Sequence, residues 1–169
     1  MPVDPRRRAL LRLAGLSLAA GALPACTSIK ATALAPFESS FAFRGPAPTG
    51  TLDAVNRARS KGGRGAMRID AKAQKAAERH ARAMARAGKM AHDLPGQPKF
   101  GQRIARDGIR TVAAENVAWG QGDVAGAVTA WMNSAGHRRN MLDKRFDGVG
   151  VASARGKDGR LYWAMILVP

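Results

Sequence analysis

The segment from Leu161 to Val168 most restricts the folds that this chain can adopt. Its sequence, LYWAMILV, places apolar or aromatic side chains on both faces of a strand, so both faces need cover from water. Such a strand lies in the centre of a sheet, with other layers packed on each side. A turn with Gly156 and Gly159 joins it to the strand-like segment 148–154, which is typical of a hairpin. The sequence therefore predicts a central antiparallel strand pair between two layers.

Helices can supply those layers. Asp70 is a favourable N-cap residue, residues 71–87 are nearly all helix formers, and Gly88 follows at the C′ position. Shorter amphipathic helices are expected over residues 51–60 and 124–133. The predicted fold class is therefore α+β, an α-β-α sandwich in which helices flank a small, mostly antiparallel sheet.

The first residues are typical of an export signal. Four arginines precede an apolar run from Leu13 to Ala25 that is too short to span a bilayer. The run ends in Leu-Pro-Ala-Cys, which resembles a bacterial lipobox, so residues 1–25 are predicted to be a lipoprotein signal peptide and Cys26 the lipidated residue. Adjacent arginines also resemble a twin-arginine signal, so both export routes stay open. Cys26 is the only cysteine of the chain, and a buried structural cysteine is the alternative.

One domain is expected behind the signal. Residues 26–50 mix small residues and prolines without a lasting period, and they contain Phe37, Phe41 and Phe43. They are predicted to be a lipidated tether that docks partly on the domain through its aromatic residues. Residues 51–169 are left for a single folded domain.

The chain is strongly basic, with 28 lysines and arginines against 12 acidic residues and a net charge of +16. Such a surface attracts polyanions. Nucleic acid is not expected, because the chain has few aromatic residues, no recognition motif and an export signal. The expected partners are the membrane, through lipid on Cys26, and anionic envelope polymers or lipids. The composition is equally consistent with a solvated basic surface that has no specific partner. The predicted location is the cell envelope, as a membrane-anchored lipoprotein in the periplasm or at the cell surface.

Two distant stretches carry the chemistry of the domain. GKMAHD contains His92, and AAEN together with SAGHRRNM adds Glu115 and His137. Two neutral imidazoles and a carboxylate suffice to bind zinc, with water in the fourth position. The residues therefore predict a cleft for a divalent metal, zinc or magnesium, or for a small ligand. Hydrogen bonds that merely brace the loops are the alternative, and the spacing does not decide between the two.

Several neighbours of these residues also have predicted roles. Side chains expected to support the cleft through hydrogen bonds are Ser134, Asn116 and Asn140. His80 borders the apolar stripe of the helix 71–87 and is predicted to be packed and hydrogen-bonded rather than a ligand. Residues 102–107 predict a short helix, and Thr111–Ala113 a brief strand or an extended entry into the segment with Glu115. The tryptophans are expected in the core or in the cleft wall: Trp119, Trp131 and Trp163.

Five motifs in order carry a resemblance to a known family. GKMAHD, AAENVAWG, AVTAWMNSAGHRRNML, FDGVGVA and YWAMILVP resemble the bacterial branch of the CAP superfamily, which includes cysteine-rich secretory proteins, antigen 5 and plant pathogenesis-related proteins. The resemblance covers residues 52–169 and implies a cleft of histidines and acidic residues that holds a divalent metal in several members. His92, Glu115 and His137 match the cleft positions of the family.

The chain departs from the family pattern close to the cleft. Ala114 and Ala135 replace a glycine and a proline, and Met165 stands where a glutamine is common. Ser134 occupies the position at which eukaryotic members carry a second glutamate. The cleft therefore has one carboxylate fewer, which predicts weaker metal binding.

Three functions are consistent with these residues. The first is a non-catalytic envelope module, anchored by lipid, whose cleft binds a metal ion, a small ligand or a partner. The second is a metal-assisted hydrolase of peptide or ester bonds, in which a metal-bound water attacks a carbonyl group. The third is a lipid or sterol carrier. No His-Glu-x-x-His helix is present and Ser134 lies in no nucleophile elbow, so the first is favoured and catalytic residues stay unknown.

Overall fold

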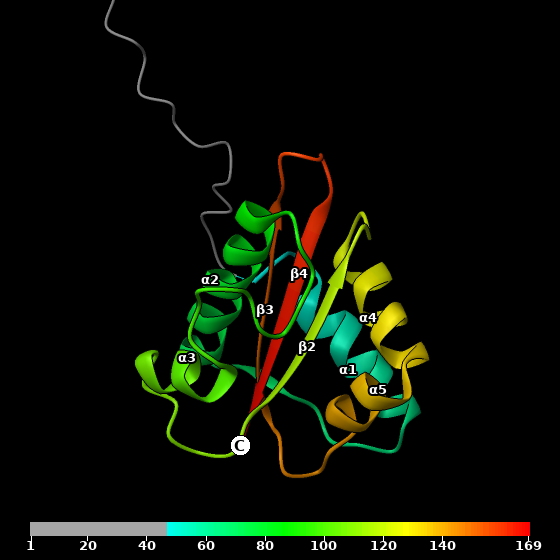
Figure 1. Cartoon of the computed structure of the whole chain (residues 1–169). Coiled ribbons are helices and arrows are strands. Elements are labelled where there is room, and N and C mark those ends of the chain that lie inside the picture. The colour runs from blue at the N-terminus through cyan, green and yellow to red at the C-terminus, as the bar shows by residue number, and fades with distance from the viewer. Residues whose placement is uncertain (1–46) are drawn as a thin grey trace, which may run out of the picture. The chain divides into compact units, whose positions relative to one another are not determined.

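The computed structural model describes residues 47–169. The predicted signal peptide, the lipidation site Cys26 and nearly all of the predicted tether lie outside these residues. The described part contains five helices and four strands, none of the helices with the length and apolar character needed to pass through a bilayer. In chain order the elements are α1 (Thr51–Lys61), β1 (Arg68–Ile69), α2 (Ala71–Ala87), α3 (Phe100–Arg106), β2 (Ala114–Trp119), α4 (Val124–Asn133), α5 (Ala135–Met141), β3 (Gly148–Arg155) and β4 (Leu161–Val168) (Figure 1).

The strands of the described part form one mixed sheet in the order β1-β3-β4-β2. β4 lies between β3 and β2 and is antiparallel to both (Figure 1). Every residue of β4 after Leu161 is buried, which confirms the predicted central strand. The two-residue strand β1 pairs parallel with β3. It was not predicted, because two residues carry no readable periodicity.

Helices cover both faces of this sheet, so the predicted α-β-α sandwich is confirmed. α2 and α3 lie on one face, and α1, α4 and α5 lie on the other (Figure 1). Alternate side chains of β4 enter the two cores. Tyr162 and Ile166 pack with the residues of α2, whereas Trp163 and Met165 pack with those of α1 and α4. The apolar character of β4 on both faces is thereby explained.

The backbone of α2 lies in direct contact with β3. A Cβ atom on Gly150 would overlap the backbone of Ala73 and Gln74, so only glycine fits at this position. The Gln74 side-chain oxygen accepts a hydrogen bond from the Val151 N–H at 3.0 Å. This contact holds α2 firmly against the centre of the sheet.

The ends of α2 agree with the sequence prediction. The Asp70 side chain accepts a hydrogen bond from the Ala73 N–H at 2.9 Å, and Gly88 adopts the left-handed conformation with φ of 60°. A side-chain cap of this kind stabilises a helix by about 1 kcal/mol. The helix therefore ends a few residues before His92.

The strand that carries Glu115 differs from the prediction. β2 begins at Ala114, so residues 111–113 are the segment that enters this strand and not a strand of their own, and Glu115 and Asn116 lie on β2 itself. Glu115 pairs with Ile166 of β4. Glutamate and asparagine disfavour strands, and the sheet overrides that local preference here. The backbone of Glu115 is consequently fixed by the central sheet.

The three tryptophans do not share one environment. Trp131 and Trp163 are buried, as predicted. Trp119 is 41% exposed, so of the two positions predicted for it, core or cleft wall, the core is excluded. The Arg160 guanidinium lies 4.5 Å from the centre of its ring, which is a cation-π distance.

Arg59 of α1 anchors the end of α5. Its guanidinium is buried and donates hydrogen bonds to the Met141 carbonyl at 2.6 Å and to the Phe146 carbonyl at 3.1 Å. Carbonyl dipoles thereby replace the water that this buried charge loses. α5, which carries His137, is fixed at its C-terminal end by these bonds.

Candidate functional site

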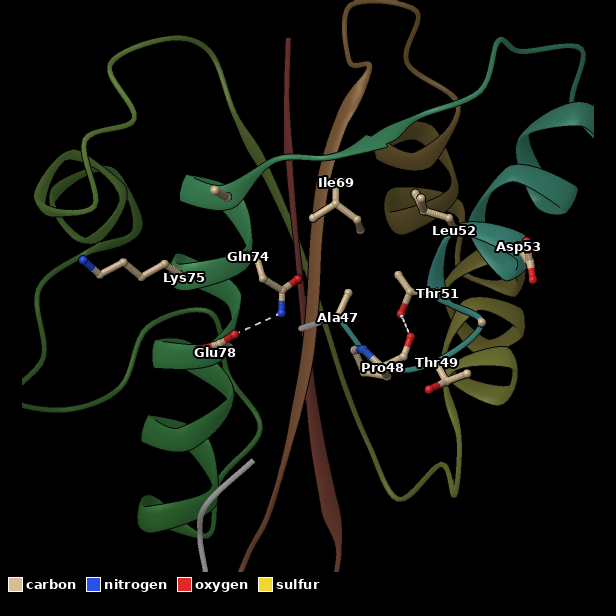
Figure 2. Close-up of a pocket in the computed structure, with 12 residues that line it drawn as sticks. Ala47, Pro48, Thr49, Thr51, Leu52, Asp53, Ile69, Gln74, Lys75 and Glu78 are labelled. Atoms are coloured by element: carbon tan, nitrogen blue, oxygen red, sulfur yellow. Dashed lines mark hydrogen bonds between the residues drawn. The ribbon is translucent and has the colours of Figure 1, made fainter. Parts of the chain in front are cut away.

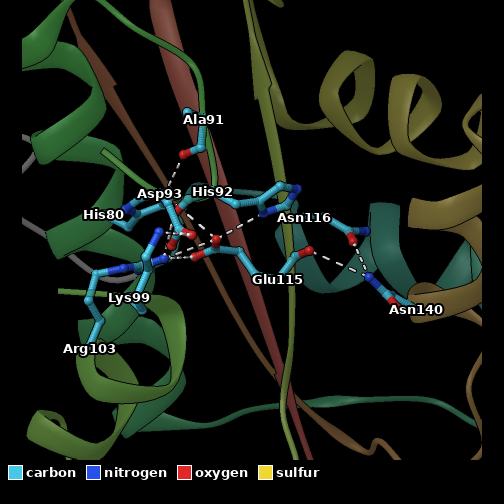
Figure 3. A network of polar contacts seen from close by, with 9 residues as sticks. All are labelled: His80, Ala91, His92, Asp93, Lys99, Arg103, Glu115, Asn116 and Asn140. Atoms are coloured by element: carbon cyan, nitrogen blue, oxygen red, sulfur yellow. Dashed lines mark hydrogen bonds and ion pairs between the residues drawn. The ribbon is translucent and has the colours of Figure 1, made fainter. Parts of the chain in front are cut away.

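The structure brings the three predicted site residues together. His92 lies in the loop after α2, Glu115 lies on β2, and His137 lies near the start of α5. The Nδ1 atom of His92 is 3.0 Å from Oε1 of Glu115, and the ring centres of His92 and His137 are 6.1 Å apart. Figure 3 shows the His92 ring turned toward the Glu115 carboxylate. Segments from three elements therefore converge on one place.

Arg103 is the principal partner of Glu115. The Glu115 side chain is only 3% exposed, and Nη2 of Arg103 donates to its two oxygens at 3.1 and 3.0 Å. The same nitrogen is 2.9 Å from the His92 carbonyl oxygen. Arg103 lies in α3, the short helix predicted over residues 102–107. Because a buried carboxylate needs a counter-charge, this arginine is required by the site, yet sequence reasoning missed it.

His80 of α2 lies behind the carboxylate. Its side chain is 1% exposed, and its Nε2 is 3.0 Å from the Ala91 carbonyl oxygen and 3.7 Å from Oε1 of Glu115. A carbonyl oxygen only accepts, so Nε2 carries the proton. Burial lowers the pKa of His80, which keeps the ring neutral. The prediction of a packed, hydrogen-bonded histidine is confirmed.

The pKa values of His92 and His137 are shifted in opposite directions. The hydrogen bond to Glu115 raises the pKa of His92 above its ordinary value, although partial burial opposes the shift. Burial lowers the pKa of His137, and repulsion from His92 lowers it further. As the pH falls, His92 therefore becomes a cation before His137 does.

Asn116 and Asn140 join β2 to α5. The fully buried Asn116 amide donates to the His137 carbonyl at 3.1 Å and accepts from the Asn140 side chain at 2.9 Å. The Asn140 amide also lies 3.4 Å from the Glu115 carbonyl oxygen. Both asparagines thus brace the segments that carry the cleft residues (Figure 3). Ser134 is the N-cap residue of α5, and in the described part of the chain no hydrogen bond joins its hydroxyl to the cleft.

The family model for the CAP, or cysteine-rich secretory protein, family matches residues 52–167. The chain belongs to this family. The CAP domain therefore occupies most of the described residues, and it contains the cluster of His92, Glu115 and His137.

Three similar proteins show how far the likeness extends. The uncharacterized protein YkwD of Bacillus subtilis is 33% identical over 101 residues, which are 59% of this chain and 39% of YkwD. A solved extracellular protein with an SCP domain from Bacillus anthracis is 27% identical, with a TM-score of 0.62, over 72% of this chain and 39% of that one. A structure of NaASP2 with Zn²⁺ is 14% identical, with a TM-score of 0.52, over 77% of this chain and 82% of that one, and shows the fold alone. The chain spans 39% of each Bacillus relative.

The cleft of this CAP domain lacks the three-ligand metal site that was predicted from the sequence. Within residues 47–169, no three His, Cys, Asp or Glu side chains are arranged to hold one metal ion. Both oxygens of Glu115 face Arg103, so this carboxylate is engaged in an ion pair. The two imidazoles are left as candidate ligands, and the His92 side chain is 54% exposed.

A pocket of the CAP domain lies away from this cluster. It has a volume of about 640 Å³ and lies between the start of α1 and α2, and no cleft residue lines it (Figure 2). The Thr51 hydroxyl there donates to the Pro48 carbonyl at 2.6 Å, and the Gln74 amide donates to Glu78 at 3.2 Å. These polar groups are already paired, so the His-Glu cleft is the better candidate for chemistry.

Proposed function

We propose that this CAP domain is an exported, non-catalytic binding module whose cleft takes a divalent metal ion, or a small ligand, at His92 and His137. The observation that carries the proposal is the hydrogen bond between His92 Nδ1 and the buried Glu115 carboxylate. A carboxylate only accepts, so Nδ1 carries the proton and Nε2 of the neutral ring keeps a lone pair. A histidine fixed in this way is prepared to bind a ligand through Nε2.

Glu115 acts in this proposal as an orienting group instead of a metal ligand. Metal-binding histidines commonly donate their second ring N–H to a carboxylate, which fixes the tautomer and makes the ring a stronger ligand. The contact from His92 to Glu115 has this form. Arg103 supplies a counter-charge to the buried Glu115 side chain at the same time. The proposal therefore revises the three-ligand set to two imidazoles.

The distance between the imidazoles fits a shared ion after a small movement. Two imidazoles on one tetrahedral zinc ion have ring centres about 5 Å apart, since each Zn–N bond is about 2.0–2.1 Å. The ring centres of His92 and His137 are 6.1 Å apart. His92 is about half exposed and lies in a loop, so it can close the difference. Water would complete the coordination of the ion, and two protein ligands predict modest affinity.

Two relatives support parts of this proposal. NaASP2, which shares the fold, was crystallised with Zn²⁺. The Bacillus anthracis relative is an extracellular protein. Together with the export signal predicted in residues 1–25, this supports a module outside the cytoplasm, and the predicted lipobox supports a lipid anchor on Cys26. Its basic surface would add attraction to anionic lipids or polymers.

Calorimetry with zinc and with magnesium tests the metal site. The wild-type chain is expected to bind one zinc ion, and His92→Ala and His137→Ala each to weaken binding at least about tenfold. Glu115→Gln should weaken binding about 10–100-fold through loss of orientation. Asp93→Asn is the matched control, because it removes a neighbouring carboxylate that points to Lys99. Equal zinc uptake by the wild type and by the double histidine variant would refute the proposal.

A further inference from the structure

The pocket between the start of α1 and α2 is an apolar groove rather than a site for chemistry. It has a volume of about 640 Å³ and is the pocket drawn in Figure 2. Apolar side chains contribute much of its lining: Ala47, Pro48, Leu52, Ile69 and Ala71. The Thr51 hydroxyl and the Gln74 amide in the same lining are already hydrogen-bonded. The open part of the groove is therefore suited to an apolar occupant.

Ile69 shows that residues 47–169 leave this groove partly uncovered. It lies on β1 at one edge of the sheet, lines the groove and is 37% exposed. The strand order β1-β3-β4-β2 leaves the outer side of β1 without a neighbouring strand among the described residues. Exposed apolar surface beside an unpaired strand edge is a contact site for another segment of chain. An extended apolar segment is the kind of occupant that fits.

The chain itself supplies such a segment next to the groove. Ala47, the first residue that the structure describes, lines the groove itself. Phe43 and Phe41 precede it by 4 and 6 residues, so an extended chain keeps them within about 14 and 21 Å of Ala47. Side chains spaced by two residues point to the same side of an extended segment. Both phenylalanines can therefore enter the groove together.

The size of the groove and the covalent linkage both favour this occupant. A benzene ring fits a cavity of about 150 Å³. The groove, at about 640 Å³, therefore accommodates two phenyl rings and the backbone that joins them. Each aromatic side chain that docks removes about 150–250 Å² of surface from water. A segment of the same chain is present at an effective concentration of about a millimolar or more, so it outcompetes a free ligand of similar affinity.

We infer that Phe41 and Phe43 dock in the groove between α1 and α2 and so attach the predicted tether to the domain. The sequence predicts that aromatic residues of the tether dock on the domain, and this groove is the place. With lipid on Cys26, as proposed above, residues 27–40 remain as the free part of the tether and span at most about 50 Å. This consequence rests on the proposed lipid anchor, whereas the docking itself does not.

Nuclear magnetic resonance tests the contact directly. The full chain is labelled with ¹³C and ¹⁵N in the Cys26→Ser background, which carries no lipid. Aromatic residues are absent from the groove lining within residues 47–169. We expect nuclear Overhauser effects between the methyl groups of Ile69 and the ring protons of Phe41 or Phe43. These signals should vanish in Phe41→Ser/Phe43→Ser. Their absence from the wild-type spectrum would overturn the inference.

Thermal unfolding measures the contribution of the docked rings. Phe41→Ser/Phe43→Ser is expected to lower the Tm of the full chain by about 5 °C or more, because two aromatic side chains return to water. Ser39→Ala/Ser40→Ala is the matched control in the same segment and should shift the Tm by less than about 2 °C. An unchanged Tm in the phenylalanine variant would show that neither ring is buried and would contradict the docking.

A substitution on the groove side locates the contact. Ile69→Ser should lower the Tm of the wild-type chain, and should cause less than about half of that shift in Phe41→Ser/Phe43→Ser, because the partners are already lost there. Val112→Ser is the matched control: Val112 is 47% exposed and does not line the groove, so its effect should be equal in both chains. Additive effects for Ile69→Ser would place the phenylalanines elsewhere and refute the assignment.

The same spectra identify other occupants. Labelled and unlabelled chains are mixed, and Overhauser effects at Ile69 that arise between molecules would assign the groove to a second copy. Signals from a lipid at Ile69, in place of those from phenylalanine, would assign it to a carrier function. Either result overturns the docking of Phe41 and Phe43. His92→Ala/His137→Ala should leave the Ile69 signals unchanged, so this inference and the metal proposal can fail separately.

Discussion

We expect the substitution Arg103→Met to lower the stability of this domain more than the substitution of any exposed charged residue. The substitution keeps an unbranched side-chain stem, but it removes the hydrogen bonds from Nη2 to both oxygens of Glu115. Glu115 is 3% exposed at its side chain, so water cannot replace the lost partner without opening the site. The contact of Arg103 with the His92 carbonyl is lost too. Glu115 then remains as a buried charge with histidines as its neighbours.

The size of the effect follows from burial. Removing one member of a buried ion pair costs about 3–5 kcal/mol. We expect the lower end, about 3 kcal/mol, because His92 is half exposed and can still supply positive charge when it is protonated. A loss of this size lowers the Tm of a domain of this length by about 10 °C. Arg68→Met is the control, since Arg68 is 60% exposed in its ion pair with Asp147 and should cost less than about 1 kcal/mol.

Urea unfolding followed by tryptophan fluorescence measures Arg103→Met, Glu115→Met, the control Arg68→Met and the double variant Arg103→Met/Glu115→Met. Removing both partners leaves no buried charge, so the double variant should recover about 2 kcal/mol relative to Arg103→Met. The reasoning fails if Arg103→Met loses no more stability than Arg68→Met. It also fails if the stability losses of Arg103→Met and Glu115→Met simply add in the double variant.

Three further predictions concern protonation, packing and anchoring. Folding raises the pKa of His92, so the stability that protonated His92 contributes is complete below its unfolded pKa of about 6.5 and is lost as the pH rises through its folded pKa. The loss of stability in His92→Gln should therefore be larger at pH 5.5 than at pH 8. A larger loss at pH 8 would contradict this prediction. Gly150→Ala should lower the free energy of unfolding in urea by about 3 kcal/mol or more, because the new Cβ atom overlaps the backbone of α2. Gly101→Ala is the control: Gly101 lies on α3 with open space around it, so this substitution should change the free energy of unfolding by less than about 1 kcal/mol. Cys26→Ser should release the protein from membranes in a fractionation experiment, and equal retention of this variant would rule out the lipid anchor.

Local patterns predicted the parts of the fold that local physics decides. β4 was identified because eight successive apolar residues need cover on both faces. α2 was identified with both ends, because the N-cap Asp70 and the C-cap Gly88 act within one turn of the helix. The strand over Glu115 and Asn116 was not predicted, because both residue types disfavour strands. Their pairing with β4 comes from the far end of the chain and leaves no local trace.

The candidate site was predicted in part for a related reason. His92, Glu115 and His137 belong to motifs, and their residue types stand out in a chain with 3 histidines. Arg103 is one of 28 lysines and arginines, and nothing around it in the sequence marks it as the partner of Glu115. The one available signal was physical: a carboxylate expected near a core needs a counter-charge, and the short helix 102–107 places basic residues close to it in sequence.

The counter-charge on Glu115 also decides what kind of cation site the cleft can be. With Glu115 and Arg103 cancelling and both imidazoles neutral, a divalent ion meets no net negative charge at His92 and His137. Binding then depends on the lone pairs of the two rings, which favours zinc over magnesium, because magnesium prefers oxygen ligands. Ser134 adds no carboxylate at the start of α5. The substitution Ser134→Glu would supply a carboxylate, so magnesium binding should appear in this variant and zinc binding should become stronger. If calorimetry shows neither change, charge is not what limits metal binding in this cleft.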